Sequence, residues 1–496
     1  MCGGGSSTPP NPATSTTNTP VGGEVPCPEH TYPSCTNVVI KGPDGTSVPC
    51  TIIPINGNIQ LRAIPNEGAS GTFQWTTTST KVSLSNTGSD TVTVTAAAQV
   101  SSARDAEIVK AIFTPASGSP CQATLNLTVI SVAFSESANQ KYGYDNMDNE
   151  AGVLHHVSVQ KNDDTKVQVA IQGGATATDL QFTSDDTAIA EPVNPASGGG
   201  TFDLTLNGKA QDRAETVIKA RCKCSEQHEL AAIRANVYRQ VSFTAKVAKI
   251  HDSTVAATAL TRPNFDVEAA EQAINRWYKA AVVTLDLSDH SDSGGVIDVR
   301  YDLNNSGKLD LEPGATSSEE TAIQTAFNPA GQKIVIVKDL AWMFFLKTAA
   351  AIGDTTISLK DSHADYMRYI VDGDSYTLGT GASAENITVQ SKSGTTVTLA
   401  AALTKDHATT DGIEWPLSGL SGNPIYVAEQ TKTEDKERQT IGHECGHSQL
   451  TWKDVESSTC LMHYSSGRTD TRVRFKEFPR KYDAGNESLW EKVPRS

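Results

Sequence analysis

The chain has 496 residues, enough for three to four domains that each bury a hydrophobic core. Its 57 acidic and 41 basic side chains leave a formal net charge of −16, which argues against nucleic acid as a partner because no basic patch offsets it. No apolar run approaches the roughly 18 residues that a membrane-spanning helix needs.

Residues 1–25 begin with Met1-Cys2-Gly-Gly-Gly and continue as a polar tract rich in Pro, Thr, Ser and Asn. This pattern resembles the mature start of a bacterial lipoprotein with its signal peptide removed and a methionine added. Cys2 would then carry the lipid, and the tract would be a flexible tether. The alternative is a plain disordered terminus. The first interpretation predicts an extracellular or cell-surface protein that meets a membrane only through Cys2.

Residues 26–132 and 133–246 are two segments of about equal length with many short alternating strands. Recurring strands separated by Gly, Asn, Asp and Ser turns predict two antiparallel sandwiches. Phe73-Gln-Trp75 and Leu180-Gln-Phe182 stand at comparable places and resemble the central strand of bacterial immunoglobulin-like repeats. That resemblance implies spacing, adhesion or stalk functions and indicates no ligand site.

The cysteines fit an oxidising compartment, although connectivity cannot be read from a sequence. A metal site at Cys222, Cys224 and His228 is conceivable, but paired cysteines are the favoured interpretation for a β-domain outside the cell. The plausible pairs are Cys27 with Cys35, Cys50 with Cys121, and Cys445 with Cys460.

Residues 247–346 begin a different kind of domain. Apolar residues at helical spacing predict a helix over 265–281, and strands are predicted at 282–287 and 333–338.

Between these strands lies a candidate calcium loop. Oxygen-bearing side chains alternate around a glycine, as in the first nine positions of an EF-hand loop. Position twelve is Pro313, however, and the nearest acid comes one place early at Glu312. A polar β-turn explains the pattern equally well. The possible Ca²⁺ ligands are Asp302, Asn304, Ser306 and Asp310.

Residues 347–420 are predicted to be a small β-module inserted into this domain. Strand-like runs stand at 354–359, 386–390 and 395–400. A neutral surface insertion is the favoured interpretation, and selection of substrates is the alternative.

Residues 421–496 contain the most informative stretch, His443-Glu444-Cys-Gly-His447. On a helix, positions i and i+4 share a face, so both imidazoles can reach one Zn²⁺ ion while Glu444 stands beside the water on the metal. The helix-favouring run 434–439 places the motif in the second half of a helix.

With Met462 and Tyr464 downstream, the chain resembles the metzincin clan of zinc endopeptidases, whose HExxH helix is followed by a third ligand and a methionine turn. The resemblance implies an α+β fold for the domain that begins at residue 247. It also implies Zn²⁺ ligands at His443, His447 and Asp454, Glu444 as general base, Met462 as the floor below the metal, and Tyr464 as an optional oxyanion donor.

One departure concerns the third ligand. The clan's pattern has a glycine at the position of Leu450, and Asp454 comes one residue later than that pattern requires. A different turn, or one extra residue in it, must therefore end the helix. Glu456 and His463 are the other candidates for the third ligand.

The sequence therefore predicts a zinc-dependent endopeptidase that takes protein or peptide substrates and is carried on two immunoglobulin-like modules. The competing hypothesis is a surface adhesin or structural protein with an inactive protease-like domain. A carbohydrate-binding protein that uses the β-modules is a third class.

Overall fold

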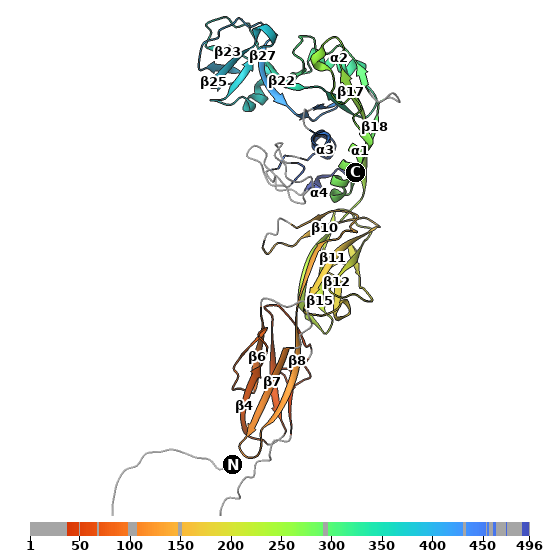
Figure 1. The fold of residues 1–496 in the computed structure, drawn as a ribbon, viewed down its shortest axis with the longest axis vertical. Helices are drawn as coiled ribbons and strands as arrows, with labels where there is room; N and C mark the ends of the chain where they lie inside the picture. Colours follow the sequence, from red (N-terminus) through yellow and green to blue (C-terminus); the bar gives the residue numbers. More distant parts are fainter. Residues whose placement is uncertain are drawn as a thin grey trace, which may run out of the picture. The chain divides into compact units, whose positions relative to one another are not determined.

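The structure is a computed structural model, drawn in Figure 1 with colours that follow the sequence. It describes residues 37–48, 50–66, 69–97, 107–146, 151–290, 296–429, 433–452, 454–455, 460–462, 473 and 489–495, without the side chains of 225–228 and 491–492. The proposed anchor at Cys2 and its tether lie outside these residues. Two compact units share the chain: Met1–Val48, Asn58–Thr95 and Glu107–Asn126 form the first, and Pro49–Gly57, Ala96–Ala106 and Leu127–Ser496 form the second.

The first unit is built from strands. Its four-stranded sheet has the order β1-β3-β6-β5, and β4 pairs antiparallel with β7. Side chains alternate between the core and the surface along its strands. In β6, Val92 and Val94 are fully buried, whereas the threonines beside them are not. The strands are β1 (Val38–Lys41), β3 (Asn58–Pro65), β4 (Gly71–Thr77), β5 (Val82–Ser85), β6 (Thr91–Ala96) and β7 (Glu107–Pro115).

The second unit begins with two sheets that share one apolar core, to which β8, β10, β11, β12, β14, β15 and β16 all contribute. One sheet has the order β12-β15-β16-β10-β9, and the other includes β13-β14-β11-β8, with β2 beside β8. The strands are β2 (Ile52–Pro54), β8 (Cys121–Glu136), β9 (Tyr144–Asp145), β10 (His156–Gln160), β11 (Asp164–Gln172), β12 (Leu180–Ser184), β13 (Ala190–Val193), β14 (Thr201–Gly208), β15 (Ala214–Cys222) and β16 (Ser225–Tyr238).

A mostly parallel sheet follows, with the order β18-β17-β21-β29-β28 and β19 beside β17. Only the edge strand β28 runs antiparallel to its neighbour. Helix α1 (Val267–Tyr278) links β17 to β18; Asp266 caps it by accepting from Ala269 N at 2.8 Å. The strands are β17 (Val241–His251), β18 (Val283–Asp289), β19 (Val296–Asp298), β21 (Gln332–Val337), β28 (Gly419–Leu420) and β29 (Ile425–Ala428).

The segment expected as a separate module, 347–420, shares a sheet with strands outside it. The order is β20-β22-β27-β24-β25-β26-β23, and β27 pairs with β22 along its whole length. One hydrophobic core spans both parts. The strands are β20 (Leu309–Leu311), β22 (Leu340–Phe345), β23 (Thr356–Ser358), β24 (Ser375–Leu378), β25 (Glu385–Ser393), β26 (Thr396–Leu399) and β27 (Gly412–Leu417).

Three further helices belong to the second unit: α2 (Ser318–Ala326), α3 (Glu434–Leu450) and the short α4 (Leu489–Lys492). Strands dominate both units, so the prediction of a mostly β, multidomain chain is confirmed. Among the described residues, no helix combines the length and the apolar character that a bilayer crossing requires.

Candidate metal centre

Helix α3 carries the HExxH motif on its second half, as the sequence predicted. Three acidic residues in its first turn, Glu434, Asp435 and Glu437, complement the positive end of the helix dipole. Residues 440–446 and Leu450 are buried and His447 is partly buried, while His443 and Glu444 are each exposed by less than a tenth. The helix therefore presents the motif from inside the domain.

The end of α3 explains the unusual spacing of the third ligand. The helix runs to Leu450, and Thr451 takes the left-handed conformation with φ 56° and ψ 21°. Trp452 N then donates to Gly446 O at 3.1 Å. The left-handed residue thus stands one position after Leu450, where the clan's pattern has its glycine, and Asp454 follows it by three residues. A non-glycine residue there costs about 1–2 kcal/mol.

The side chains of His443, His447 and Asp454 meet at one point. The two Nε2 atoms are 3.1 Å apart, and Asp454 Oδ1 lies 3.3 Å from that of His443 and 3.4 Å from that of His447. A tetrahedral zinc ion about 2.0–2.1 Å from each ligand sets ligand atoms about 3.3–3.4 Å apart. The three donors therefore fit zinc in kind and in separation. The alternatives Glu456 and His463, and the optional oxyanion donor Tyr464, lie outside the described residues.

Backbone carbonyls orient both imidazoles. His443 Nδ1 lies 3.1 Å from Leu461 O, and His447 Nδ1 lies 2.7 Å from Trp452 O. A carbonyl only accepts, so each Nδ1 carries a proton and each Nε2 faces the shared centre. A hydrogen bond from the other ring nitrogen to a backbone carbonyl is typical of histidines that ligate metals.

The electrostatics of the cluster favour positive charge at its centre. Burial opposes the charge on Asp454, but hydrogen bonds from His443 and His447 hold the pKa of its carboxyl well below the usual range. Burial also disfavours an imidazolium at His447, yet the carboxylates of Asp454 and Glu444 raise the pKa of His447 to about 9. A divalent cation would meet the same electrostatic demand.

Small residues let α3 pack closely against the residues below the site. A Cβ on Gly446 would lie 2.6 Å from Met462 Sδ and 2.9 Å from the Trp452 ring, so only glycine fits there. Met462 is fully buried in this contact. Tyr278 of α1 donates its hydroxyl to Gly442 O, and its ring packs edge-on against Trp452 at 5.3 Å.

An open cleft of about 940 Å³ lies in front of the three ligands, and Glu444 lines it with them. The edge strand β28 forms one side. A Cβ on its Gly419 would come within 3.0 Å of Glu444 Oε1, which shows how near the carboxylate is to the strand. Ser448 of α3 holds the chain after the strand, because its Oγ accepts from Gly422 N at 2.8 Å and donates to Gly422 O at 3.1 Å.

Four aromatic residues also line this cleft, and we call them the aromatic wall: Trp342 of β22, Trp415 of β27, and Tyr366 and Tyr369 of the 3₁₀ helix Asp361–Tyr369. Trp342 lies 5.5 Å from Tyr366 and 5.0 Å from Tyr369, and Tyr369 lies 5.9 Å from Trp415. Three of the four belong to the inserted segment. The insertion therefore lines the cleft, which the interpretation as a neutral surface insertion did not anticipate.

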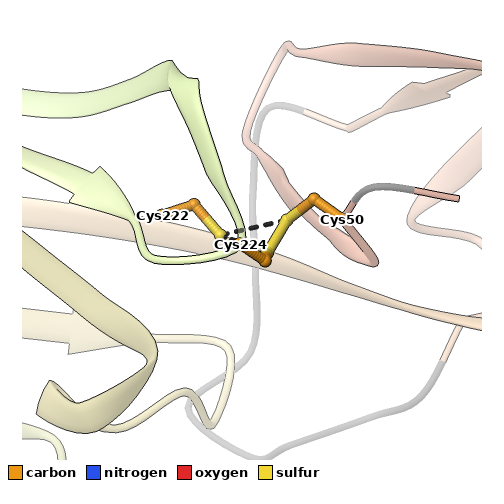
Figure 2. A group of neighbouring side chains, drawn as sticks. All are labelled: Cys50, Cys222 and Cys224. Atoms are coloured by element: carbon orange, nitrogen blue, oxygen red, sulfur yellow. Dashed lines mark hydrogen bonds between the residues drawn. A yellow bond between two sulfur atoms is a disulfide. The ribbon is translucent and has the colours of Figure 1, made fainter.

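A second cluster that could hold a metal lies far along the sequence from α3, at Cys50, Cys222 and Cys224. Cys50 and Cys224 form a disulfide, and the Sγ of Cys222 lies 3.0 Å from that of Cys50 and 2.7 Å from that of Cys224 (Figure 2). The expected Cys50–Cys121 pair is thus wrong, because the hairpin between β15 and β16 brings Cys224 to Cys50.

Of the other cysteine predictions, one is wrong and the rest fall on residues outside those described. Cys445 and Cys460 are both buried and are not joined, so that expected disulfide is also wrong. Burial raises the pKa of the Cys445 thiol well above its usual range. Cys27, Cys35 and the side chain of His228 lie outside the described residues.

Comparisons with known proteins found no family model that matches the chain and no matching curated protein. Solved structures with similar parts are fibronectin(III)-like modules of Clostridium thermocellum CbhA (14% identity, 41% of this chain, 94% of that one, TM-score 0.21), domains 4 and 5 of the S-layer protein SbsC (15%, 42%, 100%, 0.15) and the Yersinia pseudotuberculosis adhesin InvE (11%, 38%, 57%, 0.16). The chain covers 25% of a nucleoside hydrolase-related hypothetical protein from Saccharophagus degradans.

These findings correct the family resemblance stated from the sequence. The neighbours are immunoglobulin-like, fibronectin-like, S-layer and adhesin domains, and no zinc peptidase is among them. The assignment to the metzincin clan is therefore wrong. A metzincin-type α+β domain is not supported. The HExxH and Met-x-Tyr patterns are short enough to occur without common descent.

Proposed function

We propose that the chain is a zinc-dependent endopeptidase that hydrolyses peptide bonds of proteins at or outside the cell surface. One observation carries the proposal: two imidazole nitrogens and one carboxylate oxygen stand 3.1–3.4 Å apart at the floor of a cleft, with a further carboxylate beside them. Three protein ligands and an open side are typical of catalytic rather than structural zinc sites.

Each residue has a distinct task in this proposal. His443, His447 and Asp454 hold the ion, and the carbonyls behind the two imidazoles keep them in position. When bound, zinc would polarise the scissile carbonyl and make a water molecule more acidic. Glu444 does not belong to the ligand triangle but lines the same cleft, so its carboxylate takes the proton from the attacking water and passes it to the leaving amine.

The edge strand β28 offers a way to hold an extended substrate. It pairs with β29 on one side only and lines the cleft at Gly419, Leu420 and the following Ser421. An extended peptide can add to such an edge through main-chain hydrogen bonds, and this addition places it in front of Glu444. The absence of a side chain at Gly419 keeps the approach open.

The aromatic wall suggests which substrates bind best. Trp342, Tyr369 and Trp415 present ring surface to the cleft, and Leu417 and Leu420 extend the apolar area. Burying an apolar side chain there contributes about 25 cal/mol per Å² of apolar surface. The proposal is therefore a preference for large apolar or aromatic side chains next to the cleaved bond.

The first experiment compares Glu444→Gln with Glu434→Gln, which alters an exposed acid on the same helix that pairs with Arg438. Zinc content is measured by elemental analysis, and cleavage of a casein-type substrate is measured with and without chelator. We expect both variants to hold one zinc per chain, and only Glu444→Gln to lose hydrolysis. Full hydrolysis by Glu444→Gln would remove this residue from the mechanism.

A second candidate is a surface adhesin or structural protein whose C-terminal domain has no catalytic activity. The names of the structural neighbours, S-layer proteins and an adhesin, fit it better than they fit a peptidase. Their TM-scores of 0.15 and 0.16 show little beyond shared strands, so the choice rests on the metal centre. Zinc-free protein that cannot be reconstituted and cleaves nothing would favour this candidate.

Both candidate functions place the protein outside the cytoplasm. The Cys50–Cys224 disulfide is typical of oxidising compartments. We further propose that the N-terminal half supplies two immunoglobulin-like spacers and that Cys2 is the lipid attachment point. Metabolic labelling with a fatty acid, compared between the wild type and Cys2→Ser, tests the anchor.

A further inference from the structure

A second group of buried carboxylates lies outside the metal centre, around the loop between β19 and β20. Asp302, Asp310 and Glu319 are exposed by 1%, 2% and 4%. Burial, followed by the charge of neighbouring carboxylates, raises the pKa of Glu319 to about 8. Burial also raises the pKa of Asp310 to about 6, against a hydrogen bond from Asn304. Carboxylates gathered away from water are costly unless a cation accompanies them.

Hydrogen bonds wrap the loop around these groups. Asp302 accepts from Ser306 N and from Gly307 N, both at 2.8 Å, and Asn304 Oδ1 accepts from Ser306 N at 2.9 Å. Gly307 has φ +84°, a conformation that a glycine adopts without strain. The hydroxyl of Ser306, expected as a ligand, is instead engaged with the backbone of Lys308 at 3.3 Å. The loop is therefore a closed turn rather than an open polar segment.

Glu319 supplies the acid that the loop itself lacks. It is the second residue of α2, and its carboxylate accepts from Leu303 N at 2.9 Å and from Asp310 N at 2.8 Å. One side chain thus joins the beginning and the end of the loop. The sequence pattern failed at position twelve because Pro313 stands there, and the acid arrives from a helix six residues further on.

One oxygen of the cluster lacks a hydrogen bond. Asp310 Oδ2 accepts from Asn304 Nδ2 at 2.6 Å, whereas Asp310 Oδ1 is buried and has no hydrogen-bond partner among the described residues. Asp310, Asn304 and Glu319 line a cavity of about 430 Å³. A fully buried carboxylate oxygen without a partner, beside a cavity, is the kind of atom that a bound cation would satisfy.

The nearby lysines do not take this role. Lys308 Nζ pairs with Glu414 Oε1 at 2.6 Å, and Lys360 Nζ pairs with Glu312 Oε1 at 3.1 Å. Each of these cations already has an acidic partner of its own. Burial raises the pKa of Asp310, and Lys308 acts on that carboxyl only through its charge, which lowers the pKa. Among the described residues, no lysine or arginine forms an ion pair with Asp302, Asp310 or Glu319.

We propose that this loop binds a calcium ion through Asp310, Glu319 and Asn304, with Asp302 shaping the loop from behind. The donors are all oxygens, which favour hard cations, and a loop built from turns suits the irregular coordination of Ca²⁺ better than the octahedron of Mg²⁺. The residues that follow β20, Glu312 to Ala315, line the cleft of the metal centre. Calcium would therefore fix one wall of that cleft, although its binding does not rest on the proposed peptidase function.

The test uses the full chain, freed of calcium with a calcium-selective chelator and supplied with a constant zinc concentration. Calcium chloride is titrated by calorimetry, and thermal unfolding is followed with and without calcium. We expect one calcium per chain and a higher unfolding temperature. Asp310→Asn should weaken binding by about 10–100-fold, and Asp361→Asn, which alters an exposed acid paired with Lys347, should bind like the wild type.

The unfolding temperature of the calcium-free proteins distinguishes the loss of a calcium ligand from a loss of folding. Asp310→Asn removes a buried charge that has no ion-pair partner among the described residues while keeping the shape of the side chain, so the calcium-free variant should unfold at the same or a higher temperature than the calcium-free wild type. Glu319→Gln should behave likewise. Absence of calcium binding by the wild type, or equal binding by a folded Asp310→Asn protein, would overturn the proposal.

Discussion

Replacing Gly446 with alanine tests how tightly α3 is packed over the methionine below the metal centre. The new Cβ would lie 2.6 Å from Met462 Sδ and 2.9 Å from Trp452 Cε3, both in fully buried side chains. Such overpacking costs about 1–3 kcal/mol. Alanine in place of glycine within a helix returns about 0.8–1.0 kcal/mol. The net change in the free energy of unfolding is then a loss of up to about 2 kcal/mol.

Gly442 provides the matched control one turn earlier on the same helix. A Cβ there would meet Trp277 at 3.4 Å and Leu461 at 3.5 Å, which are ordinary contacts. Gly442→Ala therefore gains the helical preference without the clash, and the two variants should differ by about 1–3 kcal/mol. Both variants replace a helical glycine with alanine, so the gain in helix propensity cancels when their free energies of unfolding are compared.

Hydrogen exchange of the α3 amides measures this local stability directly, and elemental analysis of zinc measures the site. Gly446→Ala should show faster exchange and weaker zinc retention, because displaced Met462 shifts Leu461, whose carbonyl orients His443. Gly442→Ala should show slower exchange and unchanged zinc. Equal exchange in the two variants would refute the packing argument.

Two further predictions concern the β-rich parts of the second unit. In Cys224→Ser we expect Cys50 to bond to Cys222, whose Sγ lies 3.0 Å away, and mass mapping without reduction should find that pair; an alkylated Cys50 would contradict this. Although burial opposes it, hydrogen bonds led by the one from His407 lower the pKa of Glu385 from its usual 4.5 to about 2. Its contribution to stability is present above pH 4.5 and is lost as the pH falls to about 2. Glu385→Gln should flatten acid unfolding of this region over that interval, and an unchanged profile would count against the interaction.

Local patterns in the sequence predicted the features that depend on neighbouring residues. The helix that carries the HExxH motif follows from i, i+4 spacing, and Asp454, seven residues beyond His447, leaves enough chain to turn back. The end of the helix at Thr451 was not foreseen in detail, since many residues can take a left-handed conformation when the packing on both sides requires it. The pattern also suggested a family that the comparisons do not support.

Features that join distant segments were missed. Glu319 reaches the 302–310 loop from α2, and no spacing rule within the loop reveals it. Cys224 meets Cys50 across 174 residues, whereas the sequence favoured a nearer partner. The pairing of β27 with β22 likewise merges the insertion with its host. Each of these depends on how separate strands come together, which is decided by tertiary packing rather than by local preference.

The disulfide between Cys50 and Cys224 has a mechanical consequence for the chain. Its covalent bridge spans a sequence separation of 174, so tension applied along the chain crosses directly from Cys50 to Cys224 and does not extend the backbone between them. Fully extended, that stretch would lengthen the chain by about 570–630 Å at roughly 3.3–3.6 Å per residue. A pulling force along the chain therefore cannot release this length until the bridge is reduced.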